Sequence, residues 1–308
     1  MTADWNKFAS IAVDYIANIV TIGLNGVTVG YFRMPMIARL IVFVSFMLLL
    51  CLNAGRAGAL DLVNVVLAPL PPFFIEGGAS NEPPGIVTEI LTEAFRRDGK
   101  LPKYAYMPAP RAEHTVRNGR AMATVISGEA GDQAESFILS DSLLRTTVSA
   151  FVGAGYSGPP LDGFKAIADH QLTGQQSGEG RLRVISIHGD PVLSDLAAAG
   201  VVVEEVPGIE SALALVVRAE GRVVLVTFTD AALYLAQNTG VQPSLIRAFT
   251  LRYSDFFLAI ARSRPGAADL TARFNRVLNS LRQDGTVDAI LARYGATQAA
   301  LDQGLIRN

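Results

Sequence analysis

Two aspartates, Asp190 and Asp230, each follow an apolar run and open a stretch with helical spacing. An aspartate at the start of a helix accepts hydrogen bonds from free backbone N–H groups, a capping role worth ~1 kcal/mol. Pro191 favours capping by Asp190, because proline suits the first helical position. In an α/β fold, residues at helix N-termini are also available to polar ligands, so both carboxylates are candidate binding residues.

Residues able to carry out catalysis are few. His114, His170 and His188 are scattered without the spacing of metal ligands, and no Ser–His–acid or phosphate-loop signature occurs in a suitable context. The single cysteine, Cys51, lies in an apolar N-terminal run, so thiol catalysis, a cysteine zinc site and disulfides are excluded for residues 60–308. The sequence favours ligand binding over catalysis, and we expect no cofactor and no metal.

The apolar run at residues 40–52 resembles the core of a secretory signal peptide. Arg39 precedes it, and small residues follow it up to a cleavage position after Ala59. The run is shorter than the ~20 residues that a membrane-spanning helix needs. We therefore expect export to the periplasm with cleavage near Ala59, the alternative being an anchor formed by the uncleaved 40–52 segment.

The residues before this run are harder to assign. A signal peptide begins close to its basic region, so residues 34–59 are the expected signal peptide and residues 1–33 an over-extended start. Lipidation of Cys51 is disfavoured because the large Leu50 precedes it, where a small residue is usual.

Composition limits the classes of partner. Half of the 308 residues are hydrophobic and 18% are charged, as in a well-packed globular protein. Without residues 1–59, 249 residues remain, with 22 basic and 26 acidic side chains. No cluster of Lys and Arg suited to phosphates occurs, so nucleic acid and anionic lipid are poor candidates as partners.

Apolar strands and amphipathic helices alternate along residues 60–308, which predicts an α/β fold with mainly parallel sheets. Glycine and proline residues at 155–160 indicate a hinge. The pair Ser140-Asp141 indicates a turn, and the polar segment Leu172–Gly180 indicates a surface loop. The predicted strands are 62–68, 103–107, 121–127, 147–153, 182–187, 201–206, 222–227, 248–251 and 256–261. One predicted helix follows Gly85, and others cover residues 110–118, 209–219 and 230–237. Two further helices form a C-terminal pair that ends at Tyr294-Gly295.

Several short motifs occur in an order that resembles one family. They are Pro71-Pro72-Phe73, Gly85, Asn118-Gly119, Ser140-Asp141 with Arg145, Thr229-Asp230-Ala231-Ala232 and Gln283-Asp284-Gly285-Thr286. Each motif is weak alone, but their order over residues 60–295 resembles the extracellular solute-binding proteins of family 3, the polar amino-acid-binding class that serves ATP-driven importers. The chain looks like a divergent member.

The resemblance implies the type II periplasmic binding fold, with two lobes, two hinge crossings and a ligand cleft between the lobes. Lobe 1 would comprise residues 60–152 plus 248–308, and lobe 2 residues 153–247. Closure of the lobes around a ligand would bury it and give a membrane partner a shape to recognise.

The resemblance also assigns roles to the two aspartates. Asp230 falls where the family has its amine-binding carboxylate, with capping as the alternative. Asp190 falls where the family often has Ser or Thr to receive a ligand carboxylate. An aspartate there would repel a carboxylate, which favours capping.

Between Arg120 and Arg145 there is no Lys or Arg, although the family usually places a carboxylate-clamping arginine there. That arginine would fall near Gln133, which can donate only a neutral hydrogen bond. Ser127 and Glu129 lie in the loop that the family uses to bind ligand from lobe 1, with solvent exposure as the alternative for Glu129. The gap argues against an ordinary amino acid as the ligand.

Arg111 and Phe73 complete the candidate site. Arg111 follows the second strand and would either face the ligand or lie in a solvated first helical turn. Phe73 could form an apolar wall, with core packing as the alternative. Leu70 stands where a ligand-stacking aromatic residue would be expected.

Three functions remain open. The first is a monomeric periplasmic receptor that delivers a small polar solute to the permease of an ABC importer. The second is a sensory or non-transport relative whose ligand site has drifted and which serves a membrane sensor. A periplasmic dehydratase-type enzyme is the third and least favoured, because the acids of the expected cleft are unspecific.

Overall fold

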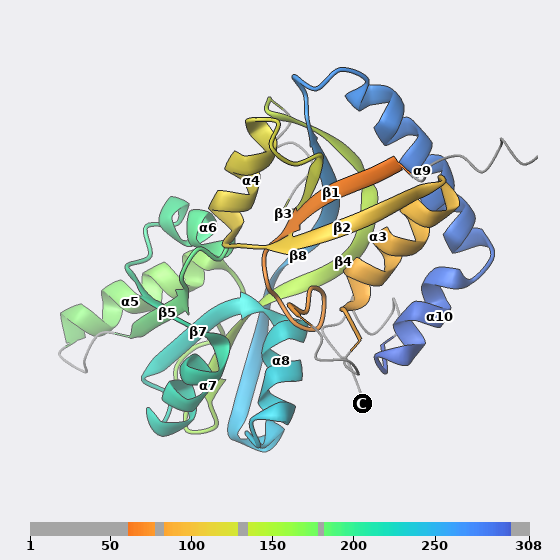
Figure 1. Cartoon of the computed structure of the whole chain (residues 1–308). Coiled ribbons are helices and arrows are strands. Elements are labelled where there is room, and N and C mark those ends of the chain that lie inside the picture. The colour runs from red at the N-terminus through yellow and green to blue at the C-terminus, as the bar shows by residue number, and fades with distance from the viewer. Residues whose placement is uncertain (1–60, 78–82, 129–134, 178–181, 297–308) are drawn as a thin grey trace, which may run out of the picture. The chain divides into compact units, whose positions relative to one another are not determined.

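The computed structural model describes residues 61–77, 83–128, 135–177 and 182–296, which all belong to one unit, Leu60–Asn308. The described strands form an eight-stranded sheet in the order β2-β1-β3-β8-β4-β7-β5-β6 (Figure 1). Four of their seven pairings are parallel. The predicted α/β class with a mainly parallel sheet is confirmed.

The first half of the sheet contains three short parallel strands. β1 (Asp61–Leu67) pairs with β2 (Lys100–Tyr106) on one side and with β3 (Ala123–Gly128) on the other. Side chains alternate between the two faces of a strand, so β1 contributes to two cores. Val65 joins the larger core, whereas Val66 joins a smaller one on the opposite face.

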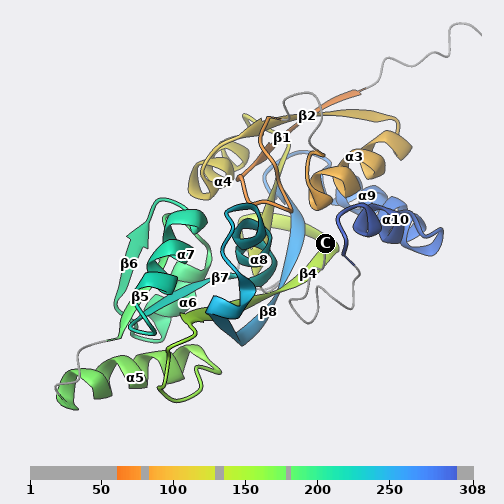
Figure 2. The ribbon, with the colours of Figure 1, turned by 90° about the horizontal axis from the view of Figure 1, so that it is seen from below.

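Helices cover both faces of this first half. α3 (Ile86–Arg97) packs its apolar stripe into the larger core, and α4 (Ala109–Arg117) packs Ala112 and Val116 into the smaller one. Figure 2 shows α3 with the C-terminal helices on one side of the strands and α4 on the other. α4 follows β2 directly, so its N-terminus lies near the end of that strand, whereas a longer connection separates β1 from α3.

Two long antiparallel strands, β4 (Phe137–Gly153) and β8 (Ile246–Ala261), run through the middle of the sheet (Figure 1). β8 pairs with β3 through residues 255–260, and β4 pairs with β7 through residues 148–152. Each strand therefore belongs to both halves of the sheet, which confirms the two predicted crossings. The exact lobe boundaries at 152 and 248 stay predictions.

Two sequence-based predictions about these strands are wrong. The pair Ser140-Asp141 does not form a turn but lies inside β4, where the register with β8 shifts between Leu139 and Ser142. The predicted strands 248–251 and 256–261 are one continuous strand. The polar residues between them remain in the ladder because β4 pairs with β8 along their whole length.

The second half of the sheet has β5 between two parallel neighbours. The strands are β5 (Arg183–Ile187), β6 (Val203–Val206) and β7 (Val223–Phe228). The helices are α5 (Phe164–Ser177), α6 (Val192–Ala198), α7 (Ile209–Arg218) and α8 (Thr229–Asn238), and a 3-10 turn, η1 (Pro243–Leu245), leads into β8. All six residues of β7 are buried, as expected for an inner strand of the sheet.

The surface loop predicted at Leu172–Gly180 is also wrong in its first part, because α5 continues to Ser177. Gln171, a buried residue of α5, donates to the backbone oxygens of Leu182 and Val202 and accepts from the Val202 N–H. These bonds tie α5 to the starts of two strands distant in sequence. Such tertiary contacts override a weak local helical pattern.

The chain ends in two helices, α9 (Ala267–Gln283) and α10 (Thr286–Arg293), which pack beside α3. Tyr294 follows α10 and donates from its hydroxyl to Glu89 of α3 at 2.7 Å. Within the described part of the chain, no helix combines the length and the apolar character needed to cross a membrane. The predicted signal peptide lies outside the described residues.

Candidate functional site

Asp230 is enclosed at the beginning of α8, next to the crossing strand β4. Its side chain is 0% exposed, and its Oδ2 accepts a 2.5 Å hydrogen bond from Oγ1 of Thr146. Oδ1 has no hydrogen-bond partner. Burial raises the pKa of Asp230 to about 7, against a smaller lowering by the Thr146 bond. The carboxyl group can therefore hold a proton near neutral pH.

The capping role considered for Asp230 is wrong. α8 begins one residue earlier, at Thr229, and its N-cap is Phe228 without a side-chain hydrogen bond. Asp230 is therefore a first-turn residue, whose carboxylate would be favoured by the helix dipole when ionised. Its hydrogen bond with Thr146 connects it to the crossing strand β4.

Asp190 lies in the loop between β5 and α6, and it does act on a helix start. Its Oδ1 accepts from the Val192 N–H at 3.0 Å, and its Oδ2 accepts from Thr227 Oγ1 at 2.8 Å. α6 begins at Val192 with Pro191 as the N-cap residue, one position later than predicted. Burial raises the pKa of Asp190 to about 6. Both of its oxygens are used inside the chain, which argues for a structural role.

A chain of buried hydroxyl groups lies beside Asp230, and the sequence analysis missed it. Thr147 Oγ1 donates to Thr229 Oγ1 at 2.8 Å, and Ser149 Oγ lies 2.7 Å from the same atom. The run Thr146-Thr147-Val148-Ser149 is unusually polar for a central strand, and this was the available signal. These bonds attach the first turn of α8 to β4.

Four phenylalanines, the aromatic cluster Phe73, Phe74, Phe228 and Phe256, connect the two halves of the sheet. The ring of Phe256, on β8, lies 4.8 Å from that of Phe73 and 5.5 Å from that of Phe74. Phe228, at the end of β7, stacks on Phe256 with ring centroids 5.5 Å apart. All four rings are buried. Phe73 therefore lies in the core, and the half-buried Leu70 packs against that core.

The remaining candidates lie at the ends of other elements. Ser127 is half-buried in β3, directly opposite Phe256 in β8. Arg111 is exposed in the first turn of α4. The preceding Pro110 lies 3.7 Å from the position that a Cβ on Gly189 would take, so α4 and the loop of Asp190 approach one another. Glu129 and Gln133 lie outside the described residues.

Two ion pairs connect the crossing strands with each other and with α6. Arg145 on β4 pairs with Asp255 on β8 at 3.1 Å, and Ser142 Oγ donates to the same carboxylate at 2.6 Å. Arg252 on β8 pairs with Asp195 of α6 at 2.7 Å.

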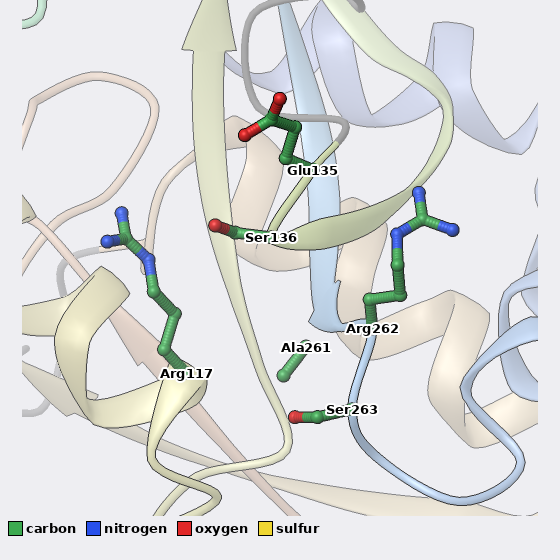
Figure 3. Close-up of a pocket in the computed structure, with 6 residues that line it drawn as sticks. All are labelled: Arg117, Glu135, Ser136, Ala261, Arg262 and Ser263. Atoms are coloured by element: carbon green, nitrogen blue, oxygen red, sulfur yellow. The ribbon is translucent and has the colours of Figure 1, made fainter.

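A separate open depression of about 450 Å³ lies at the C-terminal ends of α4 and β8 and the N-terminal end of β4 (Figure 3). Arg117, Glu135 and Arg262 line it, so its charge is mixed. The guanidinium of Arg117 stacks over the ring of Phe137, and Arg262 donates to the Phe137 carbonyl. No cluster of metal-ligating side chains occurs among the residues that the structure describes.

Comparison with known proteins identifies the fold through structure alone. No family model matches the sequence, and no curated protein matches it. EhuB in complex with hydroxyectoine is 20% identical with a TM-score of 0.61, and the match covers 78% of this chain and 91% of that one. A histidine kinase sensor domain with similarity to periplasmic binding proteins is 19% identical with a TM-score of 0.59, covering 75% and 95%. An ancestral arginine-binding protein bound to arginine is 15% identical with a TM-score of 0.58, covering 76% and 97%.

These structures share the arrangement described above over nearly their whole length. Their identities are too low to carry more than the architecture. The chain has the two-lobed α/β fold of the periplasmic binding proteins.

Proposed function

We propose that the protein is a periplasmic solute-binding protein, a divergent member of family 3, that captures a small polar solute between its two lobes. The observation that carries this proposal is the unpartnered Oδ1 of the enclosed Asp230, at the junction of α8 with the crossing strands. A buried carboxylate oxygen without a donor is costly, and an amine-bearing solute would supply that donor.

The charge pattern favours a solute without an α-carboxylate. Residues 121–144 contain no Lys or Arg, and Arg145 is paired with Asp255. Asp190 stands where a carboxylate would otherwise be received, and its own negative charge opposes one. Small amines and polyols are therefore better candidates than ordinary amino acids.

A thermal-shift screen tests the proposal with amines, polyamines, polyols, sugars, organic acids and amino acids. A ligand at 100 times its Kd stabilises the folded state by about 2.7 kcal/mol, which is a clear rise in melting temperature. We expect one solute class to give this rise, and Asp230→Asn to remove it. Binding of a standard amino acid that survives Asp230→Asn would overturn the assignment of the site.

Delivery to the permease of an ABC importer is the proposed role of the bound complex, after export directed by residues 34–59. Genes for a permease and an ATPase beside this gene would support it. A sensory role is the second candidate, favoured by the likeness to a histidine kinase sensor domain. A neighbouring sensor kinase gene, without permease genes, would favour sensing over transport.

A further inference from the structure

The arginines beside the open depression at the end of α4 come from two segments that are distant in the sequence. Arg117 lies in the last turn of α4, whereas Arg262 and Arg264 lie in the connection from β8 to α9. A second depression, of about 570 Å³, adjoins the first, because both are lined by Arg117, Ala261 and Ser263. Arg264 lines this second part. Folding therefore gathers three guanidinium groups that the linear sequence keeps apart.

Phe137, the first residue of β4, holds two of these guanidinium groups near one another. The guanidinium of Arg117 lies over its ring, 5.4 Å from the centroid. The side chain of Arg262 donates to its carbonyl oxygen at 3.1 Å, and the backbone N–H of Arg262 donates to the carbonyl of Ser136. Phe137 itself is fully buried, so its position is fixed by the core. An anion that contacts both guanidiniums would meet donors whose positions are already restricted, which lowers the entropic cost of binding.

Arg264 supplies donors that the chain itself does not use. It is half-buried, and its side chain forms no hydrogen bond or ion pair with any residue that the structure describes. A guanidinium group carries five N–H donors and stays charged in proteins. An anion in the adjoining depression would supply acceptors for these donors, and hydrogen bonds between charged groups are the strong ones.

The charge around the two depressions is positive in balance. Three arginines line them against one acid, the exposed Glu135. Glu113 pairs with Arg117 at 2.8 Å and offsets part of its charge. The C-terminal end of α4 carries a partial negative charge, which the full charges of the arginines outweigh. The hydroxyl groups of Ser136 and Ser263 add neutral donors to the lining.

We propose that the two adjoining depressions form a binding site for a small phosphate-type oxyanion, separate from the solute site between the lobes. Guanidinium groups match the oxygens of a phosphate in bidentate geometry, and several of them together suit a dianion better than a single carboxylate. The concave shape favours a free phosphate or a phosphorylated small molecule over a flat membrane surface.

This site does not rest on the proposed function. Phe137 supports the arginines, and Thr146 bonds to Asp230. Both residues belong to β4, and nine positions along an extended strand separate them by roughly 25–30 Å. The two sites can therefore be tested independently.

Calorimetric titration of the full chain with sodium phosphate tests the proposal, with the ionic strength held constant by sodium chloride. Arg264→Gln should weaken phosphate binding by about tenfold, because it removes donors to a charged ligand and breaks no contact within the described chain. Glu135→Gln should strengthen binding by roughly twofold or more, because it removes an acid that repels the anion. Arg276→Gln is the matched control, an exposed arginine of α9 outside both depressions, and should leave binding unchanged.

Equal affinities of the wild type and Arg264→Gln for phosphate would overturn the site, as would a wild type that binds no phosphate. Vesicles of phosphatidylglycerol in phosphatidylcholine distinguish the source of the phosphate group. Vesicle binding that depends on Arg264, without binding of free phosphate, would overturn the small-anion site in favour of a membrane contact. Asp230→Asn should leave phosphate binding unchanged, so a failure of the solute site and a failure of this site give different results.

Discussion

Asp190 and Asp230 are both enclosed acids, yet their oxygen atoms are used differently. Both carboxylate oxygens of Asp190 accept hydrogen bonds, one from the backbone at the start of α6 and one from Thr227. In Asp230, by contrast, Oδ1 has no hydrogen-bond partner. The sequence shows both as acids after strands, and by itself favours capping more strongly for Asp190. Which oxygen stays unpaired depends on Thr146, which lies in β4 and is distant from Asp230 in the sequence.

The free energy of unfolding should depend on pH through Asp230. Its folded pKa, about 7, lies above the unfolded value of about 3.9, so the folded state binds more protons between these values. The contribution of Asp230 to the free energy of unfolding should therefore be fully present below about pH 4 and decrease by about 1.4 kcal/mol per pKa unit as the pH rises to about 7, with no further change above it.

Urea unfolding of the wild type and Asp230→Asn between pH 5 and 8 measures this effect. The variant cannot ionise, so its slope over this range should be much smaller, with the remainder due to Asp190 and other groups. Identical slopes in the two proteins would show that the carboxyl group of Asp230 does not titrate in this range.

At the scale of elements, local sequence patterns predicted most strands and helices. They failed where contacts between distant segments determine how far a helix or strand extends. The segment Leu172–Gly180 looks like a loop because it is polar and rich in glycine, yet α5 continues to Ser177, tied to two strands by Gln171. β8 was divided in two because Arg252, Ser254 and Asp255 interrupt its apolar pattern. The ladder with β4 keeps these residues extended, and partners on β4 and α6 satisfy the two charged ones.

β8 should owe much of its stability to Phe256, which contacts three other rings of the aromatic cluster. Phe256→Ala would leave a cavity where both halves meet, and large-to-small changes of this kind cost about 3–5 kcal/mol. Tyr253→Ala on the same strand is the control, because its side chain is 58% exposed and its loss should cost about 0.5 kcal/mol or less. Guanidinium unfolding measures both, and equal losses would contradict a central role for the cluster.

At the scale of the whole molecule, the sequence predicted the fold because the order of strands, turns and helices survives when individual motifs are weak. It placed Asp230 within one residue of the start of the helix after β7. It could not show that Thr146 bonds to Asp230, since Thr146 lies inside a long strand and is distant from Asp230 in the sequence. Phe228 and Phe256 were hidden for the same reason, as apolar residues in apolar strands.

The aromatic cluster also predicts that the two lobes stay together without a solute. Phe228 belongs to the second half, Phe73 and Phe74 to the first, and Phe256 to the crossing strand between them. By size alone, a compact chain of the 249 residues from 60 to 308 has a radius of gyration of about 18 Å. Small-angle X-ray scattering of residues 60–308 should give a value near this one. Phe228→Ala should increase the radius, because it removes the contact of the second half with the cluster.

Phe274→Ala is the matched control for this experiment. Phe274 is equally buried and packs against Phe95, but both residues lie on helices of the first half. Its loss should lower the free energy of unfolding by about 3–5 kcal/mol without separating the lobes, so the radius of the folded protein should not change. An increase in both variants would indicate general loosening rather than opening. An unchanged radius in Phe228→Ala would mean that other contacts, such as the approach of Pro110 to Gly189, suffice to hold the lobes together.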